Sequence, residues 1–246
     1  MQKRINYGQI LSGIIWIIVG LIFDAIIQVV GVEVSKVFGK LSGLGPNSLP
    51  SLAIEIIVII LLAALAMWVL VKWGIRPVSP KFGLHQFRWE KLRYVLWGYL
   101  AIIGVSMVVN LVQVLVNGKV HVAQNQQLLE MMAKQGPNRL VFVLTLAVLV
   151  APFIEETIFR GIILNYFFKK SNWWINVVLS GVLFGYFHLM GYDSFDIFAF
   201  LQYSTMGIIL AIVYKKTKQI QYSISLHLLN NAIGAISIIA MVMNTK

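Results

Sequence analysis

Three ionisable side chains lie within an apolar stretch that is long enough to cross a membrane. Glu155, Glu156 and Arg160 fall inside residues 140–168, LVFVLTLAVLVAPFIEETIFRGIILNYFF. Each charged group near the centre of a membrane helix costs about 2.5–3.5 kcal/mol on insertion scales. Charges inside a membrane segment usually mark a functional site, so this cluster predicts chemistry within the bilayer.

The spacing of the three groups gives them different roles on a helix. Glu156 and Arg160 share one face because residues i and i+4 are neighbours, and they can form an ion pair. Glu155 is rotated by about 100° from Glu156. Arg160 can therefore hold one carboxylate ionised while the other acts on a water molecule. Two alternatives remain: a buried ion pair that fixes helix packing, and a proton relay in a transporter.

Two of the four histidines lie in later apolar stretches and are candidate partners of the glutamates. The sequence FGYFH places Phe184 and His188 on one helix face, and HLLNN places His227 and Asn231 on one face. Glu and His can activate water as a general base, and His and Asn can donate hydrogen bonds to an oxyanion. These are the requirements of amide hydrolysis without a covalent nucleophile.

The same side chains could instead hold a metal ion. Glu155, His188 and His227 form a two-histidine, one-glutamate set, which in catalytic zinc sites leaves a fourth position for water. The HExxH spacing of soluble zinc proteases is absent. The chain has no cysteine, which excludes disulfides, thiolate ligands and a cysteine nucleophile. The residues favour neither a zinc site nor a metal-free site.

Windows of about 20 residues identify seven apolar stretches that must position these groups. They cover residues 10–30, 52–71, 94–116, 140–168, 173–190, 197–214 and 220–242. The stretches are too long for barrel strands and lack strict alternation, so we expect helices. Only 12% of the residues are charged, against about 25% in soluble domains, and the mean hydropathy is +0.82. The predicted fold is an all-α, polytopic transmembrane bundle of about seven to eight helices. We expect a single integral membrane domain over residues 1–246, with a motif-bearing core at about 140–242.

The net charge of +11 comes from basic residues in short loops, where they act as topology signals. Thirteen Lys and Arg fall on the side of the N-terminus and six on the other side, with Arg160 inside the membrane segment. This bias predicts a cytoplasmic N-terminus. No basic stripe with interleaved aromatic residues is present, so we expect no nucleic-acid partner.

Further expectations concern packing. Residues 117–138 predict an amphipathic helix outside the membrane that ends at Gly136 and Pro137. Gly181 and Gly185 form a pair of small residues that lets a neighbouring helix approach closely. Glu55 lies near the outer end of its segment, from which we expect it to reach the membrane interface. By helix rise, Glu155 lies nearer the inner end of its helix and His188 nearer the outer end of the next, yet the mechanism requires them to meet.

The three motifs together resemble those of a known family. EETIFR matches the pattern EExxxR, FGYFH matches FxxxH and HLLNN matches HxxxN, in this order and on separate helices. The chain is similar, over about residues 152–231, to the CPBP family of intramembrane proteases, also called the Abi or CAAX-protease-like family. This family includes the eukaryotic Ras-converting CAAX endopeptidase. The first 140 residues match only in being helical and membrane-embedded.

The resemblance implies a buried, water-accessible site and a role for each matched residue. Glu155 would be the catalytic carboxylate that activates water, assisted by His188. His227 and Asn231 would stabilise the oxyanion. Glu156, Arg160 and Phe184 would support and orient these groups. The family is described as metalloproteases, with zinc as the candidate metal on Glu155, His188 and His227, and a metal-free, glutamate-dependent mechanism has also been proposed.

The expected function is therefore an intramembrane endopeptidase acting on a membrane-associated peptide or protein. The resemblance implies peptide maturation or bacteriocin self-immunity, and the composition suggests a bacterial, multi-pass protein of the plasma membrane. The lipid bilayer and the peptide substrate are the expected partners. Two other functions stay open: a non-catalytic membrane scaffold or binding protein, and a small proton-coupled transporter, for which the inverted repeat and broken-helix pattern are not seen.

Overall fold

The computed structural model describes residues 6–45, 47–168, 173–192 and 194–244, and these ranges contain helices and no strand. Six of the described helices are long and apolar enough to cross a membrane, and a shorter apolar helix covers Trp174–Phe187. The prediction of an all-α, polytopic bundle is confirmed. The chain is a multi-pass membrane protein.

Each of the seven predicted apolar stretches coincides with a helix. The elements are α1 (Tyr7–Leu41), α2 (Leu49–Val69), η1 (Leu70–Ile75), η2 (Trp89–Lys91), α3 (Leu92–Asn117), α4 (Gln124–Ala133), α5 (Pro137–Leu144), η3 (Thr145–Val150), α6 (Ala151–Glu156), η4 (Thr157–Ile163), α7 (Leu164–Tyr166), α8 (Trp173–Phe187), α9 (Ile197–Thr217) and α10 (Ile220–Asn244). The apolar stretch predicted over residues 10–30 ended too early. Helix α1 continues to Leu41 and includes a turn in which Lys36 pairs with Glu33. Hydropathy reports the apolar length of a helix, and charged residues can extend the same helix past it.

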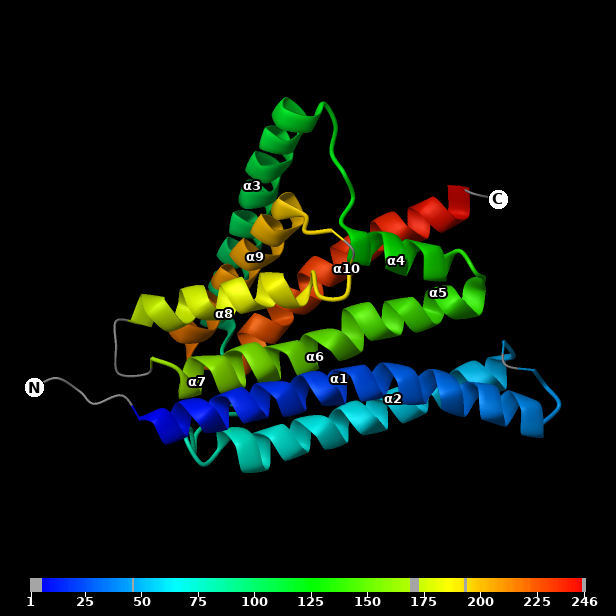
Figure 1. Cartoon of the computed structure of the whole chain (residues 1–246), viewed down its shortest axis with the longest axis horizontal. Helices are drawn as coiled ribbons and strands as arrows, with labels where there is room; N and C mark the ends of the chain where they lie inside the picture. Colours follow the sequence, from blue (N-terminus) through cyan, green and yellow to red (C-terminus); the bar gives the residue numbers. More distant parts are fainter. Residues whose placement is uncertain (1–5, 46, 169–172, 193, 245–246) are drawn as a thin grey trace, which may run out of the picture.

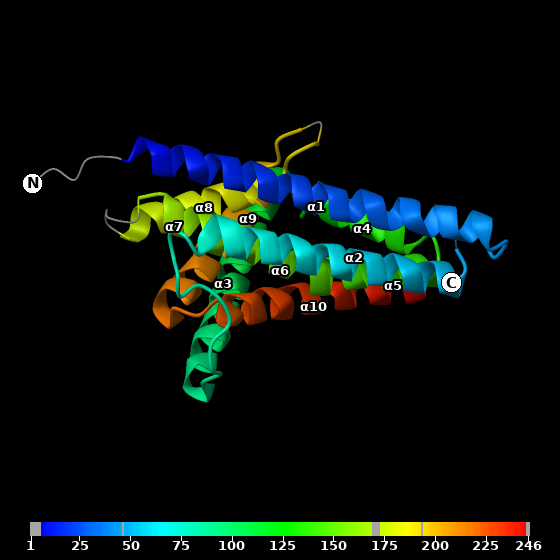
Figure 2. The same cartoon turned by 90° about the horizontal axis from the view of Figure 1, so that it is seen from below.

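Three of the long helical segments run along the long axis of the molecule. Figure 1 and Figure 2 show α1, α2 and the helix from α5 to α7 lying along this axis, while α10 runs obliquely to it and α3 and α9 are steeply inclined. The helix from α5 to α7 covers Pro137–Tyr166 and is called the motif helix below. It packs against α1, α2, α8 and α10, so its side chains form much of the buried core.

Small residues on α1 bring this helix close to the motif helix. A Cβ atom on Gly20 would lie 2.7 Å from Ile158, and one on Gly13 would lie 2.8 Å from Tyr166. Real Cβ atoms do not approach other heavy atoms so closely, so glycine is required at both positions. In membranes the hydrophobic effect does not favour contact between helices, so their association depends on close packing of this kind.

The motif helix is not a regular α-helix, because two π-helical stretches, η3 and η4, flank α6. Pro152 explains the first of them. Proline has no amide N–H, and its ring excludes the carbonyl four residues earlier, so the α-helical pattern cannot continue through it. The amide of Ala151 bonds instead to the carbonyl of Leu146, five residues back. The wide turns thus lie on both sides of Glu155 and Glu156, and such turns frequently occur at functional sites.

Glycines also join α8 to α9, as the Gly181 and Gly185 pair predicted. A Cβ atom on Gly181 would lie 2.7 Å from the carbonyl oxygen of Ser204, and one on Gly185 would lie 2.9 Å from that of Phe200. Only glycine allows the two backbones to approach this closely. The end of α8, where His188 follows, is therefore pressed against the first half of α9.

Candidate active site

The centre of the site is an ion pair within one turn of the motif helix. Arg160 Nε lies 3.0 Å from Glu156 Oε2, at the predicted i, i+4 spacing, and both side chains are fully buried. The guanidinium also donates to the Ser180 hydroxyl on α8 at 3.4 Å and lies over the Phe184 ring, 5.1 Å from its centroid. A buried arginine needs such partners, because an unpaired charge in this environment is very costly.

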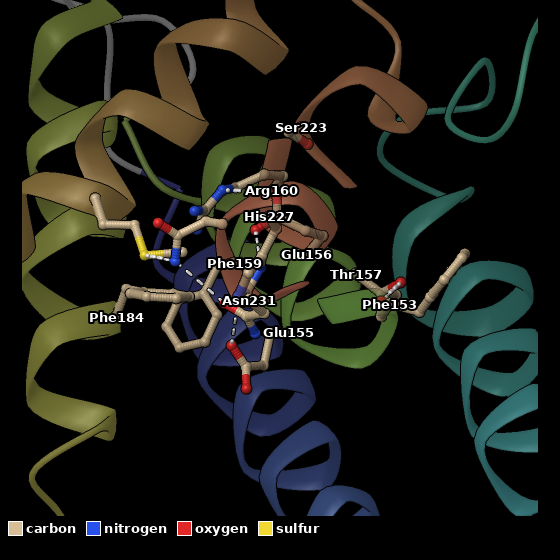
Figure 3. Close-up of polar contacts among 12 residues, drawn as sticks. Phe153, Glu155, Glu156, Thr157, Phe159, Arg160, Phe184, Ser223, His227 and Asn231 are labelled. Carbon is tan, nitrogen blue, oxygen red and sulfur yellow. Dashed lines mark hydrogen bonds and ion pairs between the residues drawn. The ribbon is translucent and has the colours of Figure 1, made fainter. Parts of the chain in front are cut away.

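His227 on α10 reaches both glutamates (Figure 3). Its Nδ1 lies 3.2 Å from Glu156 Oε1 and its Nε2 lies 3.7 Å from Glu155 Oε2. The imidazole is almost completely buried. Because an ionised carboxylate only accepts hydrogen bonds, Nδ1 must be the donor to Glu156. Glu156 thus orients His227 so that Nε2 faces Glu155.

His188 follows the last residue of α8 and approaches Glu155 from another side. Its Nε2 lies 3.8 Å from Glu155 Oε2, and its Nδ1 lies 2.9 Å from the carbonyl oxygen of Phe184. A carbonyl cannot donate, so Nδ1 carries a proton and Nε2 of the neutral ring presents its lone pair to the site. The ring lies between those of Phe184 and Tyr203, with centroids 4.4 Å away on each side.

The structure therefore brings together Glu155, His188 and His227, which come from three separate helical segments. Within the described part of the chain, no hydrogen-bond donor reaches the buried Oε2 atom of Glu155. A buried carboxylate oxygen without a donor is unusual and calls for an explanation. The expected difference in depth between Glu155 and His188 does not keep them apart, since α8 is only 15 residues long and brings His188 to the level of α6.

Asn231 lies one turn beyond His227 on α10. Its Nδ2 donates to the carbonyl oxygen of Ala147 at 2.9 Å. The amide of Ala151, which would bond to this carbonyl in an α-helix, bonds to Leu146 instead, and Pro152 has no N–H. One Asn231 proton thus satisfies the π-helical turn, and the amide retains a second N–H.

One residue that contacts the site, Tyr203, was not identified from the sequence. Tyr203 stacks on His188 at an interplanar angle of 21°, and its hydroxyl donates to Asn125 on α4. The only sequence signal for this contact is the glycine pair that precedes His188.

Glu55 is fully buried and pairs with Arg139 Nη1 at 3.0 Å, so the expectation that it reaches the membrane interface is wrong. Arg139 lies in the first turn of the motif helix, where it is close enough to pair with Glu55 inside the protein.

A cavity of about 140 Å³ adjoins the site. Its polar wall consists of Asn125, Gln126, His188, Tyr203, Asn230 and Asn231, and its apolar wall of Leu129, Val143, Leu144, Ala147, Val148, Gly234, Ala235 and Ile238. The wall comes from α4, the motif helix, α9, α10 and the residue after α8. His188 and Asn231 belong to both the site and the cavity, so a molecule in the cavity would touch two of the predicted catalytic residues.

The two-histidine, one-glutamate set does not have the arrangement of a metal centre. Among the residues that the structure describes, no group of three or more His, Asp or Glu side chains is placed to hold a metal ion. The Nε2 atoms of His188 and His227 face Glu155 Oε2 at 3.8 and 3.7 Å. We therefore derive no chemical step through a metal.

Comparison with known proteins gives two matches and one negative result. Residues 137–233 match the family described as "Type II CAAX prenyl endopeptidase Rce1-like". The chain is 36% identical over 83 residues to a protein of Bacillus subtilis (strain 168) named "Putative membrane peptidase YdiL". This similarity covers 34% of the chain and about a third, 32%, of the relative. No solved structure matches the chain.

The family match covers the part of the chain that contains the three sequence motifs. The family match begins at the first residue of the motif helix and ends two residues after Asn231. It includes the EETIFR, FGYFH and HLLNN motifs. Over residues 137–233, the chain is similar to the CAAX-protease-like (CPBP) family.

Proposed function

We propose that the protein is an intramembrane endopeptidase that hydrolyses a peptide bond in a membrane-associated peptide or protein. The observation that carries the proposal is Glu155 Oε2, a buried carboxylate oxygen that faces two imidazole Nε2 atoms at 3.7 and 3.8 Å. In the described part of the chain no donor occupies this oxygen. A general base must have such a free acceptor, pointed to where the water will be.

In this proposal Glu155 removes a proton from water as the water oxygen attacks the scissile carbonyl carbon. His188 Nε2 accepts a second hydrogen bond from the same water and so fixes its orientation, because its Nδ1 is held by the Phe184 carbonyl. The tetrahedral intermediate then breaks its C–N bond. The proton held by Glu155 passes to the leaving amine, which restores the carboxylate.

The oxyanion would be stabilised by His227 and by the second N–H of Asn231. For His227 to donate from Nε2, the imidazole must be protonated on both nitrogens, since Nδ1 already donates to Glu156. Carboxylates face both of its nitrogens, Glu156 at Nδ1 and Glu155 at Nε2. In this proposal Glu156, which is paired with Arg160, holds His227 in place.

The finer biological assignment follows the family resemblance. The proposed substrate is a small membrane-associated peptide, in peptide maturation or bacteriocin self-immunity. The proposed location is the plasma membrane of a bacterium, with the N-terminus in the cytoplasm as the basic loops predict. The proposed mechanism requires no metal ion, so strong chelators should leave the purified protein active.

The test is the substitution Glu155→Gln, which keeps the shape of the side chain and removes the base. We expect the rate of peptide cleavage by vesicle-reconstituted protein to fall by about 10²–10⁴-fold, the range for loss of a general base. Peptidomics of cells with the wild-type or the Glu155→Gln protein then identifies peptides that require this carboxylate.

The matched control is Glu33→Gln, which changes an exposed glutamate on α1 in the same way. This variant should retain wild-type cleavage. Full turnover by pure, folded Glu155→Gln protein would rule out the proposed mechanism.

A further inference from the structure

The cavity beside the site has the position of a binding place for part of the substrate. His188 and Asn231 lie in its wall, so a group inside the cavity is in direct contact with the proposed catalytic residues. A peptide advances by only about 3.3–3.6 Å per residue. A side chain in the cavity must therefore belong to a residue that flanks the bond to be cleaved.

The wall determines which side chains can enter. It contains the carboxamides of Asn125, Gln126, Asn230 and Asn231, together with aliphatic side chains, and no Asp, Glu, Lys or Arg among its described residues. Carboxamides can both donate and accept hydrogen bonds, which suits a peptide backbone and neutral side chains. A charged side chain would find no counter-charge there and would lose its hydration.

The size of the cavity also limits its occupant. Its volume is about 140 Å³. A protein cavity of about 150 Å³ is large enough to bind benzene. One side chain of the size of leucine or phenylalanine therefore fits, and two do not.

Gly234 on α10 keeps this cavity open. It lines the cavity, is exposed, and has no heavy atom within 4 Å of the position of an added Cβ atom. Several helical glycines of the chain are required by packing, such as Gly207, where a Cβ atom would lie 2.8 Å from Phe184. Gly234 has no such neighbour, although glycine within a helix is unfavourable relative to alanine. Helix packing therefore does not account for a glycine at position 234, but the open cavity beside it does.

We propose that the cavity is a subsite for one uncharged side chain, up to the size of phenylalanine, next to the scissile bond, and that Gly234 sets its capacity. This inference rests on the proposed function. Substrates with a neutral residue at this position bind with that side chain between α4 and α10, against Asn125 and Gln126. Substrates with Asp, Glu, Lys or Arg at the position are rejected.

The test uses N-palmitoylated, internally quenched nonapeptides in which each central position is varied among Gly, Leu, Phe, Asp and Lys. Cleavage is measured with wild-type, Gly234→Phe and Gly104→Phe proteins in lipid vesicles. Gly104, on α3, is the matched control, because it is also an exposed helical glycine with nothing within 4 Å of an added Cβ. Size-exclusion chromatography and thermal unfolding in detergent verify that the variants are folded.

At one position we expect the wild-type protein to cleave Leu and Phe peptides and to discriminate against Asp and Lys. Gly234→Phe should lower kcat/KM for the Leu and Phe peptides by about 10–200-fold, the range for a hydrophobic pocket that no longer fits its group. The Gly peptide should lose far less, and Gly104→Phe should change none of them. Equal effects of Gly234→Phe on all peptides, or wild-type acceptance of Asp and Lys at every position, would overturn the proposal.

Binding of the same peptides to Glu155→Gln protein separates this inference from the proposed function. Binding that depends on Gly234 without cleavage by the wild type would reject the peptidase function and keep the subsite. Cleavage by the wild type that is indifferent to Gly234 would reject the subsite and keep the function. The absence of both binding and cleavage for every peptide would reject both.

Discussion

Two buried glutamate–arginine pairs in this bundle have the same separation and different surroundings. Glu55 Oε1 lies 3.0 Å from Arg139 Nη1, and Glu156 Oε2 lies 3.0 Å from Arg160 Nε. In each pair the glutamate is fully buried. The first pair joins α2 to the start of the motif helix across 84 positions of the chain. The second lies within one helical turn.

The neighbours of the two pairs decide what each can do. Arg139 retains 16% exposure and lies beside Phe142, and within the described residues the second oxygen of Glu55 has no hydrogen-bond partner. The second oxygen of Glu156 instead contacts His227, which in turn faces Glu155. A buried ion pair becomes part of a reactive site when its remaining oxygen holds a group that can donate or accept a proton.

Glu156→Gln should have the largest effect of the substitutions that separate the two pairs. It leaves Arg160 buried without a counter-charge, which costs about 3–5 kcal/mol of stability. It also removes the acceptor that orients His227, so we expect peptide cleavage per folded molecule to fall by at least about 100-fold. Unfolding in detergent and vesicle-based cleavage assays measure the two effects separately.

Glu55→Gln is the matched control, with the same chemical change in the other pair. It should also destabilise the protein, toward the lower end of that range because Arg139 is partly exposed. Its cleavage rate per folded molecule should stay near the wild-type value. If Glu55→Gln lowered this rate as much as Glu156→Gln, the difference drawn between the pairs would be wrong.

Asn231→Ala should have the next largest effect, because it removes a proposed oxyanion donor. It tests how far the site extends along α10. Loss of one oxyanion donor lowers kcat by about 10²–10³-fold. The substitution also leaves the Ala147 carbonyl without its donor, so some loss of stability should accompany it. Steady-state kinetics on reconstituted protein check the prediction.

Asn230→Ala is the control for Asn231→Ala. Within the described part of the chain, the Asn230 amide donates to Asn231 Oδ1 and to the sulfur of Met206, so we expect a loss of about tenfold or less. Equal losses at the two positions would show that Asn231 acts through the shape of the helix and not through its free N–H.

Tyr203→Phe should have the smallest effect. The ring that stacks on His188 remains, and only the hydrogen bond to Asn125 is lost. A hydrogen bond of this kind contributes about 1 kcal/mol, so kcat should fall by roughly three- to tenfold with KM nearly unchanged.

A double-mutant cycle makes this prediction specific. If the hydroxyl acts through Asn125, the double variant Tyr203→Phe with Asn125→Ala should be no slower than the slower single variant. Additive losses would show that the two residues act separately, and His188 would then be positioned by Phe184 alone.

The two ion pairs differ in how far they can be predicted from the sequence. The Glu156–Arg160 pair follows from the i, i+4 geometry of a helix and could be predicted. The Glu55–Arg139 pair could not, because its partners are 84 positions apart and meet through the packing of two helices. Hydropathy placed Glu55 by its depth in the segment, and depth does not say which face of a helix is covered.

The amino-acid sequence by itself determined the helical, membrane-spanning class of the chain, its seven apolar segments and the face shared by Glu156 and Arg160. These properties depend on local hydrogen bonding and on transfer into lipid, which act over a few residues or one helix. Only the tertiary structure decided that His188 and His227 turn their Nε2 atoms toward Glu155. It also decided that Asn231 donates to the carbonyl oxygen of Ala147. Contacts between helices depend on the tilt, rotation and depth that close packing imposes, and hydropathy carries no information on these.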